Sequence, residues 1–170
     1  CMSEEEVCSN AARDEIIRRH YEALNRYANG ADNEHEVNKI ALIMKQAKLT
    51  TDYRRTTIAA RERKEQWNCP AAAIELADGT IIKAGSSELL GPSAALILNA
   101  TKHLAGIPHE VKLIPQSMIE PIQHTKVSFL HGRNPRLHTD EVLVALSLLS
   151  TTDENCRRAL DQLPKFDGRQ

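Results

Sequence analysis

The chain has few aromatic residues and no excess of charge of either sign. Only 4% of its 170 residues are Phe, Trp or Tyr, and 22 basic side chains stand against 23 acidic ones. Proteins that bind single-stranded nucleic acid use aromatic stacking platforms, and proteins that coat polyanions use a basic field. The composition therefore argues against nucleic acid as a partner.

Long apolar runs and a secretion signal are also lacking. The longest nearly uncharged stretch, residues 85–106, contains Glu88 and Lys102, and its apolar part is too short and too interrupted to span a bilayer. The beginning of the chain has neither the basic region nor the apolar core of a signal peptide. We therefore expect no membrane contact and a cytoplasmic location.

Cysteine is scarce and scattered. The four cysteines are Cys1, Cys8, Cys69 and Cys156. They form no Cys-x-x-Cys pair, so we interpret them as reduced thiols. His124, His131 and His138 recur every seven residues, but proline and glycine between them interrupt any helix that would align them. The sequence predicts no metal site.

The first part of the chain, residues 1–67, is predicted to be helical. Apolar residues follow helical spacing over residues 14–28, and Asn29-Gly30 supplies a left-handed stop. A second helix is expected after Asn33, with a buried stripe that runs to Ala47. These two helices predict a helical hairpin, and a short charged helix over residues 59–67 follows it.

In the second part, residues 68–170, the spacing of the hydrophobic residues changes. Two short apolar runs flank Asp78-Gly79, which is a strong signal for a β-hairpin. Pro92 then opens an apolar helix that extends to Ala105, and residues 111–114 are predicted to add a strand.

Three more helices are expected towards the end of the chain. The first covers residues 117–128 with a bend at Pro121, the second begins after a Thr139 cap, and the last begins at Thr151 or Thr152. The pattern as a whole predicts one α/β domain over residues 1–170. Its architecture is a helical hairpin followed by a small mixed sheet layered with helices.

The strongest candidate site is the loop before the penultimate helix. It combines two guanidinium groups, an imidazole and the free amides of a helix start, which together suit an anion such as phosphate. The candidate ligand-binding residues are Arg133, Asn134, Arg136, His138 and Thr139. The alternative interpretation is structural, with Thr139 as a helix cap and the arginines paired with carboxylates across a domain interface.

A weaker candidate lies around the glycine- and serine-rich turns that follow the hairpin. Its residues are Ser86, Ser87 and Ser93, with Asn99 on the helix beyond them. Small residues there can aim backbone amides at an acidic group, and Asn99 shares a helix face with His103. The alternatives are close packing of sheet on helix and ordinary satisfied polar residues. No catalytic residue and no cofactor is indicated.

Several stretches together resemble a known bacterial family. They are Glu15-Ile16-Ile17-Arg18-Arg19 with Tyr21, the run Pro70-Ala71-Ala72-Ala73-Ile74-Glu75-Leu76-Ala77-Asp78-Gly79, Glu120-Pro121-Ile122-Gln123-His124, and Arg133-Asn134-Pro135-Arg136-Leu137-His138-Thr139-Asp140-Glu141-Val142-Leu143. From about residue 12 to Pro164 the chain is similar to the C-terminal part of the family catalogued as domain of unknown function 1846. The family's activity is not established.

The resemblance implies a larger context for the chain. Family members are longer and have an N-terminal α/β portion with a glycine-rich segment that resembles a phosphate loop. We therefore expect the chain to be a C-terminal fragment, with the missing N-terminal domain as a partner and self-association into a homo-oligomer.

The order of elements also resembles the cytidine-deaminase-like αβα sandwich, without its zinc site. A zinc deaminase needs a His or Cys with Glu two residues on, followed by Pro-Cys-x-x-Cys. The only His-x-Glu, at His20-Tyr21-Glu22, has no paired cysteines after it.

Two functions follow from these features. The first is contribution to a phosphate- or nucleotide-type anion site that the missing N-terminal domain completes. The second is a non-catalytic docking or oligomerisation domain. Whether the protein is an enzyme stays open.

Overall fold

The computed structural model describes residues 4–31 and 33–166. The chain divides into two compact units, residues 1–57 and residues 58–170. The division falls inside helix α3 (Arg55–Trp67), whereas the sequence predicted the change of character after residue 67. Membership of both units in one domain stays a prediction.

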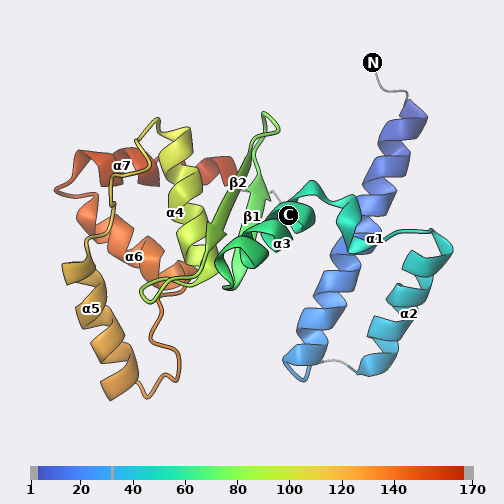
Figure 1. Ribbon diagram of the computed structural model, residues 1–170, viewed down its shortest axis with the longest axis horizontal. Coiled ribbons are helices and arrows are strands. Elements are labelled where there is room, and N and C mark those ends of the chain that lie inside the picture. The colour runs from blue at the N-terminus through green and yellow to red at the C-terminus, as the bar shows by residue number, and fades with distance from the viewer. Residues whose placement is uncertain (1–3, 32, 167–170) are drawn as a thin grey trace. The chain divides into compact units, whose positions relative to one another are not determined.

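The first unit is a pair of helices. Helices α1 (Glu4–Ala28) and α2 (Glu34–Gln46) run antiparallel (Figure 1), and a short 3-10 turn, η1 (Thr51–Tyr53), follows them. Ile17, Ala23 and Met44 are buried in this unit. The predicted hairpin is confirmed, including its stop at Gly30, where φ is +70°. Helix α1 begins earlier than predicted. Three glutamates in its first turn stabilise this start through their interaction with the positive end of the helix dipole.

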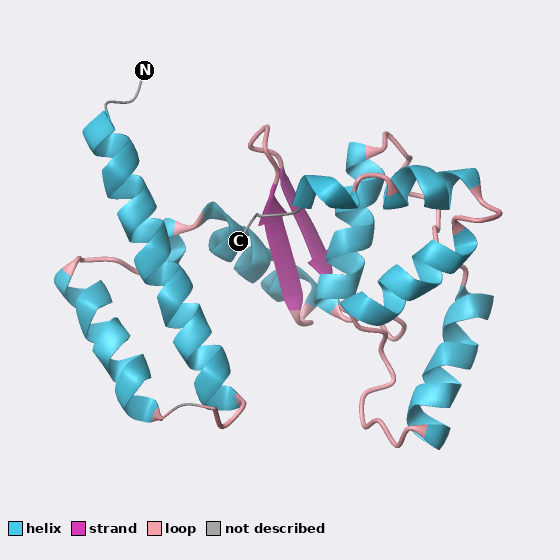
Figure 2. Ribbon diagram, turned by 180° about the vertical axis from the view of Figure 1, so that it is seen from behind, coloured by secondary structure: helices cyan, strands magenta, loops and turns pink. Residues whose placement is uncertain are grey.

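The second unit contains a β-hairpin of strands β1 (Ala71–Glu75) and β2 (Ile81–Gly85), drawn in magenta in Figure 2. The strands are antiparallel, with Ile74 opposite Ile82. At the turn, the Asp78 carboxylate accepts a hydrogen bond from the Thr80 amide at 2.9 Å, and Gly79 has a φ of +82°. The hairpin predicted from Asp78-Gly79 is therefore confirmed.

The predicted α/β class is confirmed, but the sheet is antiparallel rather than mixed, because β1 and β2 form the whole sheet within the described residues. Residues 111–114 form no strand, although Leu113 and Ile114 are buried in the core. Side chains bond two carbonyl groups of this segment: the Cys156 thiol donates to Leu113 at 3.1 Å and the Lys102 ammonium donates to Val111 at 3.3 Å. A two-stranded antiparallel sheet does not support the cytidine-deaminase-like sandwich, so that expectation is corrected.

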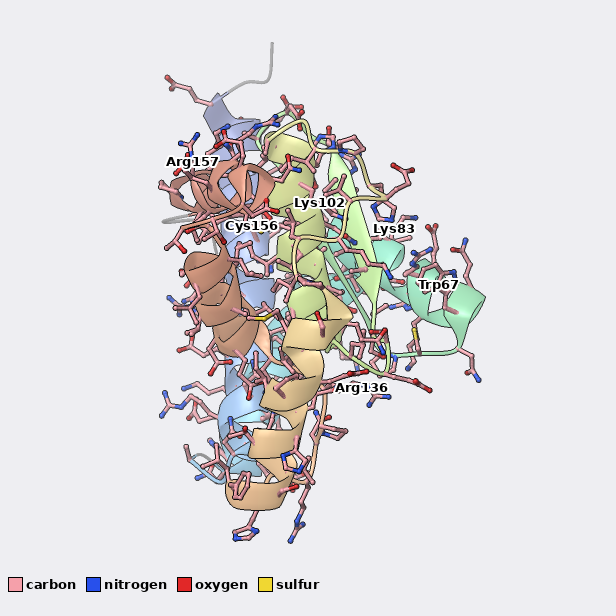
Figure 3. The ribbon with its side chains drawn as sticks, turned by 90° about the vertical axis from the view of Figure 1, so that its left-hand side faces the viewer. Trp67, Lys83, Lys102, Arg136, Cys156 and Arg157 are labelled. Carbon is pink, nitrogen blue, oxygen red and sulfur yellow. The ribbon has the colours of Figure 1, made fainter. Side chains whose placement is uncertain are left out.

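Helices cover both faces of the hairpin. Figure 3 shows Lys83 of β2 between Trp67 of α3 on one side and Lys102 of α4 (Pro92–Leu104) on the other. Lys83 forms an ion pair with Glu62 of α3 at 3.2 Å. A Cβ atom at Gly85 would lie 2.8 Å from the Cys69 sulfur and 3.2 Å from the Trp67 ring, so the close approach of α3 and the residues after it to β2 favours glycine.

Four further helical segments complete the second unit. They are α5 (Gln116–His124), the π-helix η2 (Thr125–Phe129) that continues it, α6 (Thr139–Leu149) and α7 (Glu154–Leu160), with the 3-10 turn η3 (Leu163–Phe166) at the end. The core lies where α4, α6 and α7 meet, around the fully buried Leu137, Val142 and Leu146. No helix in the described ranges is both long enough and apolar enough to cross a membrane.

Two predicted helix starts are shifted. The N-cap of α6 is His138 rather than Thr139, and the N-cap of α7 is Asp153 rather than Thr151 or Thr152. The thiol of Cys156, on α7, is fully buried, and burial raises its pKa to about 11. Cys8, Cys69 and Cys156 are free thiols, and Cys1 lies outside the described residues.

Candidate anion-binding pocket

The two candidate segments of the sequence meet in one pocket with a volume of about 390 Å³. The pocket is lined by Pro70, Ser86, Gly91, Pro92, Ser93, Ala94, Asn134, Arg136, His138 and Thr139. The turn after β2, the start of α4 and the loop before α6 therefore form one concave site, although they lie far apart in the sequence.

The start of α4 contributes backbone amides to this pocket. Gly91 is the N-cap in an extended conformation, no side chain caps the helix, and Pro92 occupies the first turn. The amide of Gly91 is already used, because it donates to the Leu137 carbonyl at 2.9 Å. The two residues after Pro92, Ser93 and Ala94, line the pocket, and their amides have no acceptor within the helix. The positive end of the helix dipole therefore lies at the pocket.

The start of α6 reaches the same pocket through His138 and Thr139. The backbone amide of His138 donates to the Glu141 carboxylate at 2.7 Å. This hydrogen bond closes the first turn of α6 and explains why the helix begins one residue earlier than its threonine suggested. Two helix N-termini thus converge on the pocket.

Arg136 supplies the positive side chain of the pocket. Its Nε donates to the Ser87 carbonyl at 2.5 Å, and its backbone amide donates to Asn134 Oδ1 at 3.1 Å. Among the described residues, neither Nη nitrogen of Arg136 has a hydrogen-bond partner. These two donors form the planar fork that binds phosphate or carboxylate in a bidentate way. Figure 3 shows Arg136 beside the N-terminal end of α4.

Lys126 of η2 connects the loop before α6 to the first turn of that helix. Its ammonium donates to the Arg136 carbonyl at 2.9 Å and to the Glu141 carboxylate at 2.8 Å. Burial disfavours the charged form of Glu141, but the hydrogen bonds from Lys126 and the His138 amide outweigh it, so the pKa of Glu141 lies below its ordinary value. Sequence spacing gave no signal for Lys126, because its contacts depend on how η2 folds back on α6.

His138 is held by its neighbour in the loop. The Asn134 amide nitrogen lies 3.1 Å from His138 Nε2, and the Asn134 oxygen already accepts the Arg136 amide. This second bond orients the Asn134 side chain, so its nitrogen donates and Nε2 accepts.

Three predicted site residues lie elsewhere. Arg133 is exposed and does not line the pocket, although it lies in the same loop. The side chains of Ser87 and Asn99 line a second pocket, together with Lys102, which sequence reasoning missed. Within residues 4–31 and 33–166 there is no group of three or more His, Cys, Asp or Glu side chains that suits a metal ion.

Comparison with known proteins identifies the family. Residues 52–170 match the family model described as Domain of unknown function DUF1846, C-terminal, and residues 1–48 match the model of its N-terminal domain. The chain belongs to this family. The resemblance seen in the sequence is confirmed, but its restriction to the C-terminal part is corrected, because the first 48 residues match the N-terminal model.

Curated relatives of the family are longer bacterial proteins. The chain is 46% identical to the UPF0371 protein cu0538 of Corynebacterium urealyticum and 38% identical to a UPF0371 protein of Streptococcus pneumoniae. These matches cover 99% and 98% of the chain and 34% of each relative. The chain therefore spans about a third of the length of these relatives.

Proposed function

We propose that the pocket between α4 and α6 binds a phosphate-bearing small molecule. The observation that carries this proposal is the convergence of two helix N-termini and the free Nη fork of Arg136 on one concave site. Helix N-termini attract anions through unpaired amides and the helix dipole, and an arginine fork adds bidentate contacts. All these groups belong to the second compact unit, residues 58–170.

The local charge supports an anion. Asp140 and Glu141 lie in the first turn of α6, where they partly offset the helix dipole. Glu141 is already neutralised by its ion pair with Lys126 at 2.8 Å. Arg136 has no ion pair with any carboxylate of the described residues, so its charge is available to a ligand.

The size of the pocket favours a ligand larger than inorganic phosphate. Its volume of about 390 Å³ lies within the range of small-molecule sites, which is roughly 300–1,000 Å³. Pro70 and Pro92 add apolar walls beside the polar groups. A nucleotide or a small phosphomonoester would occupy this space with its phosphate at Arg136 and the α4 amides.

A thermal-shift panel tests the proposal. It compares phosphate, pyrophosphate and common nucleotides, with and without magnesium, against chloride at matched ionic strength. A ligand at about one hundred times its dissociation constant should stabilise the protein by roughly 2.7 kcal/mol. We expect a shift with a phosphate compound for the parent chain and its loss in Arg136→Ala.

Arg133→Ala is the matched control, because it removes the same charge from the same loop outside the pocket. We expect this variant to keep the ligand-dependent shift. Equal loss in both variants would mean that only general charge matters, and the absence of a shift in every protein would contradict the proposal.

The cytoplasmic location proposed for this activity is supported by the three free thiols of the described residues.

Self-association is a second candidate function. Its support is a largely apolar groove on α5 and α6, in which Val144 and Leu148 are 62% and 64% exposed. The groove is lined by Ile122, Val144, Ala145 and Leu148 together with the acidic Asp140 and Glu141. Exposed apolar patches often mark protein contacts. The partner proposed here is a second copy of the chain. The anion panel distinguishes this function from phosphate binding, because self-association requires no response to phosphate.

A further inference from the structure

A second pocket, with a volume of about 420 Å³, lies along α4 on the other side of the loop that precedes it. Its apolar lining consists of Leu89, Leu90, Ala95, Leu98, Val111, Leu113, Ile114 and Ile119. Ser86 faces the anion pocket and Ser87 faces this one, so residues 86–90 separate the two sites. Its chemistry differs from that of the anion pocket, because aliphatic side chains rather than helix-start amides dominate it.

The pocket contains a buried lysine. Lys102 is 9% exposed, and its ammonium donates to the carbonyl groups of His109 and Val111 at 2.7 and 3.3 Å. Lys102 has no ion pair with a carboxylate anywhere in the described residues. Burial lowers the pKa of Lys102, and the charge of Glu110 opposes this effect. Buried charges are ordinarily paired with an opposite charge, so this ammonium lacks its usual partner.

An unused amide lies beside this lysine. Asn99 precedes Lys102 by three residues on α4, so the two side chains share one face of the helix. Both line the pocket. The side-chain amide of Asn99 has no hydrogen-bond partner among the described residues, and the ammonium of Lys102 has a third donor beyond the two carbonyl groups.

We infer that this pocket is a second binding site, which takes a small aliphatic monocarboxylate. The carboxylate accepts hydrogen bonds from Lys102 and Asn99, and it places a negative charge in direct contact with the ammonium, which Glu110 affects only without an ion pair. The alkyl chain lies among the aliphatic side chains that α5 and residues 111–114 contribute. Lys112 at the rim adds a second positive charge against the single carboxylate of Glu110. This inference is independent of the proposed phosphate site.

An NMR titration of the isotope-labelled 170-residue chain tests the inference with hexanoate as the probe. Hexan-1-ol is the control, because it has the same alkyl chain without the charge. We expect saturable shifts at the Asn99 side-chain amide and at residues 111–114, and an affinity for hexanoate about tenfold higher than for the alcohol. Equal affinities, or the absence of saturable shifts at these groups, would overturn the inference.

Variants separate the two polar contacts. Lys102→Met keeps the length of the side chain and should lower the affinity for hexanoate about tenfold, to that of the alcohol. Lys83→Met, which removes a lysine of β2 outside the pocket, should leave the affinity unchanged. Because Lys102 also holds the 109–111 backbone, Asn99→Leu is the second variant, and it should weaken hexanoate severalfold without loss of fold. An unchanged affinity in Asn99→Leu would contradict the proposed contact whether or not Lys102→Met folds.

Discussion

Arg136 is fixed by three hydrogen bonds, one through its side chain and two through its backbone. Its Nε contacts Ser87, its amide contacts Asn134, and its carbonyl contacts Lys126. A residue whose backbone and guanidinium are both held loses less conformational entropy when it binds a ligand. This preorganisation distinguishes Arg136 from Arg133, which has the same charge but a place outside the pocket.

Glu141 should make the stability of the protein depend on pH in acid. Its pKa in the folded chain lies below the ordinary value of 4.5, since the hydrogen bonds from Lys126 and His138 outweigh the effect of burial. Its contribution is therefore complete above that ordinary value and is lost as the pH falls through the lower, folded pKa. We expect Glu141→Gln to lose less stability than the parent between about pH 5 and pH 2 in urea unfolding.

Lys126→Met tests the same ion pair from the other side. It should flatten the same part of the pH profile, because it removes both a hydrogen bond and the charge that lower the pKa of Glu141. Parallel acid profiles for the parent and both variants would contradict this account of Glu141.

At the residue scale, the sequence identified the groups that local spacing reveals. Asn134, Arg136, His138 and Thr139 lie within one short loop, and all four line the pocket. Lys126 and Lys102 were missed, because their roles depend on carbonyl groups of segments that fold back towards them. Nothing in the residues around either lysine indicates these contacts.

Helix starts show the limit of local reasoning at the scale of elements. Before α7, Thr151, Thr152 and Asp153 are all able to cap a helix, and the structure uses Asp153, whose carboxylate accepts the Cys156 amide at 2.9 Å. Burial of the Cys156 side chain decides which residue lies at the cap. The sequence specifies that a helix begins here, and tertiary packing specifies where.

Loss of this cap should destabilise the protein measurably. We expect Asp153→Ala to lower the free energy of unfolding by about 1 kcal/mol, the usual loss when a capping side chain is removed. Asp153→Ser keeps a capping oxygen and should retain most of the stability. Urea unfolding of the three proteins measures both effects, and a variant Asp153→Ala as stable as the parent would show that the Asp153–Cys156 bond contributes nothing.

The three apolar runs that were predicted as strands had different outcomes for a physical reason. Residues 71–75 and 81–85 are joined by Asp78-Gly79, whose turn geometry brings them into register. Residues 111–114 have no such partner, and they bury Leu113 and Ile114 without forming a strand. An apolar run predicts burial, but only a pairing signal predicts a sheet.

At the scale of the whole molecule, both pockets lie in the second compact unit, residues 58–170. The helical hairpin of the first unit has its own buried residues, among them Ile17 and Met44. The relatives extend over about three times the length of this chain, since the match covers 34% of their sequence. All residues that line the candidate anion-binding pocket belong to this second unit.

The most direct test of the anion site is an amide NMR titration of the parent chain with inorganic phosphate against chloride at equal ionic strength. The account predicts saturable phosphate-specific shifts that are largest for the amides of Ser93, Ala94 and Thr139, where the two helix starts line the pocket. Shifts of equal size with chloride, or shifts confined to exposed basic residues such as Arg133, would contradict it.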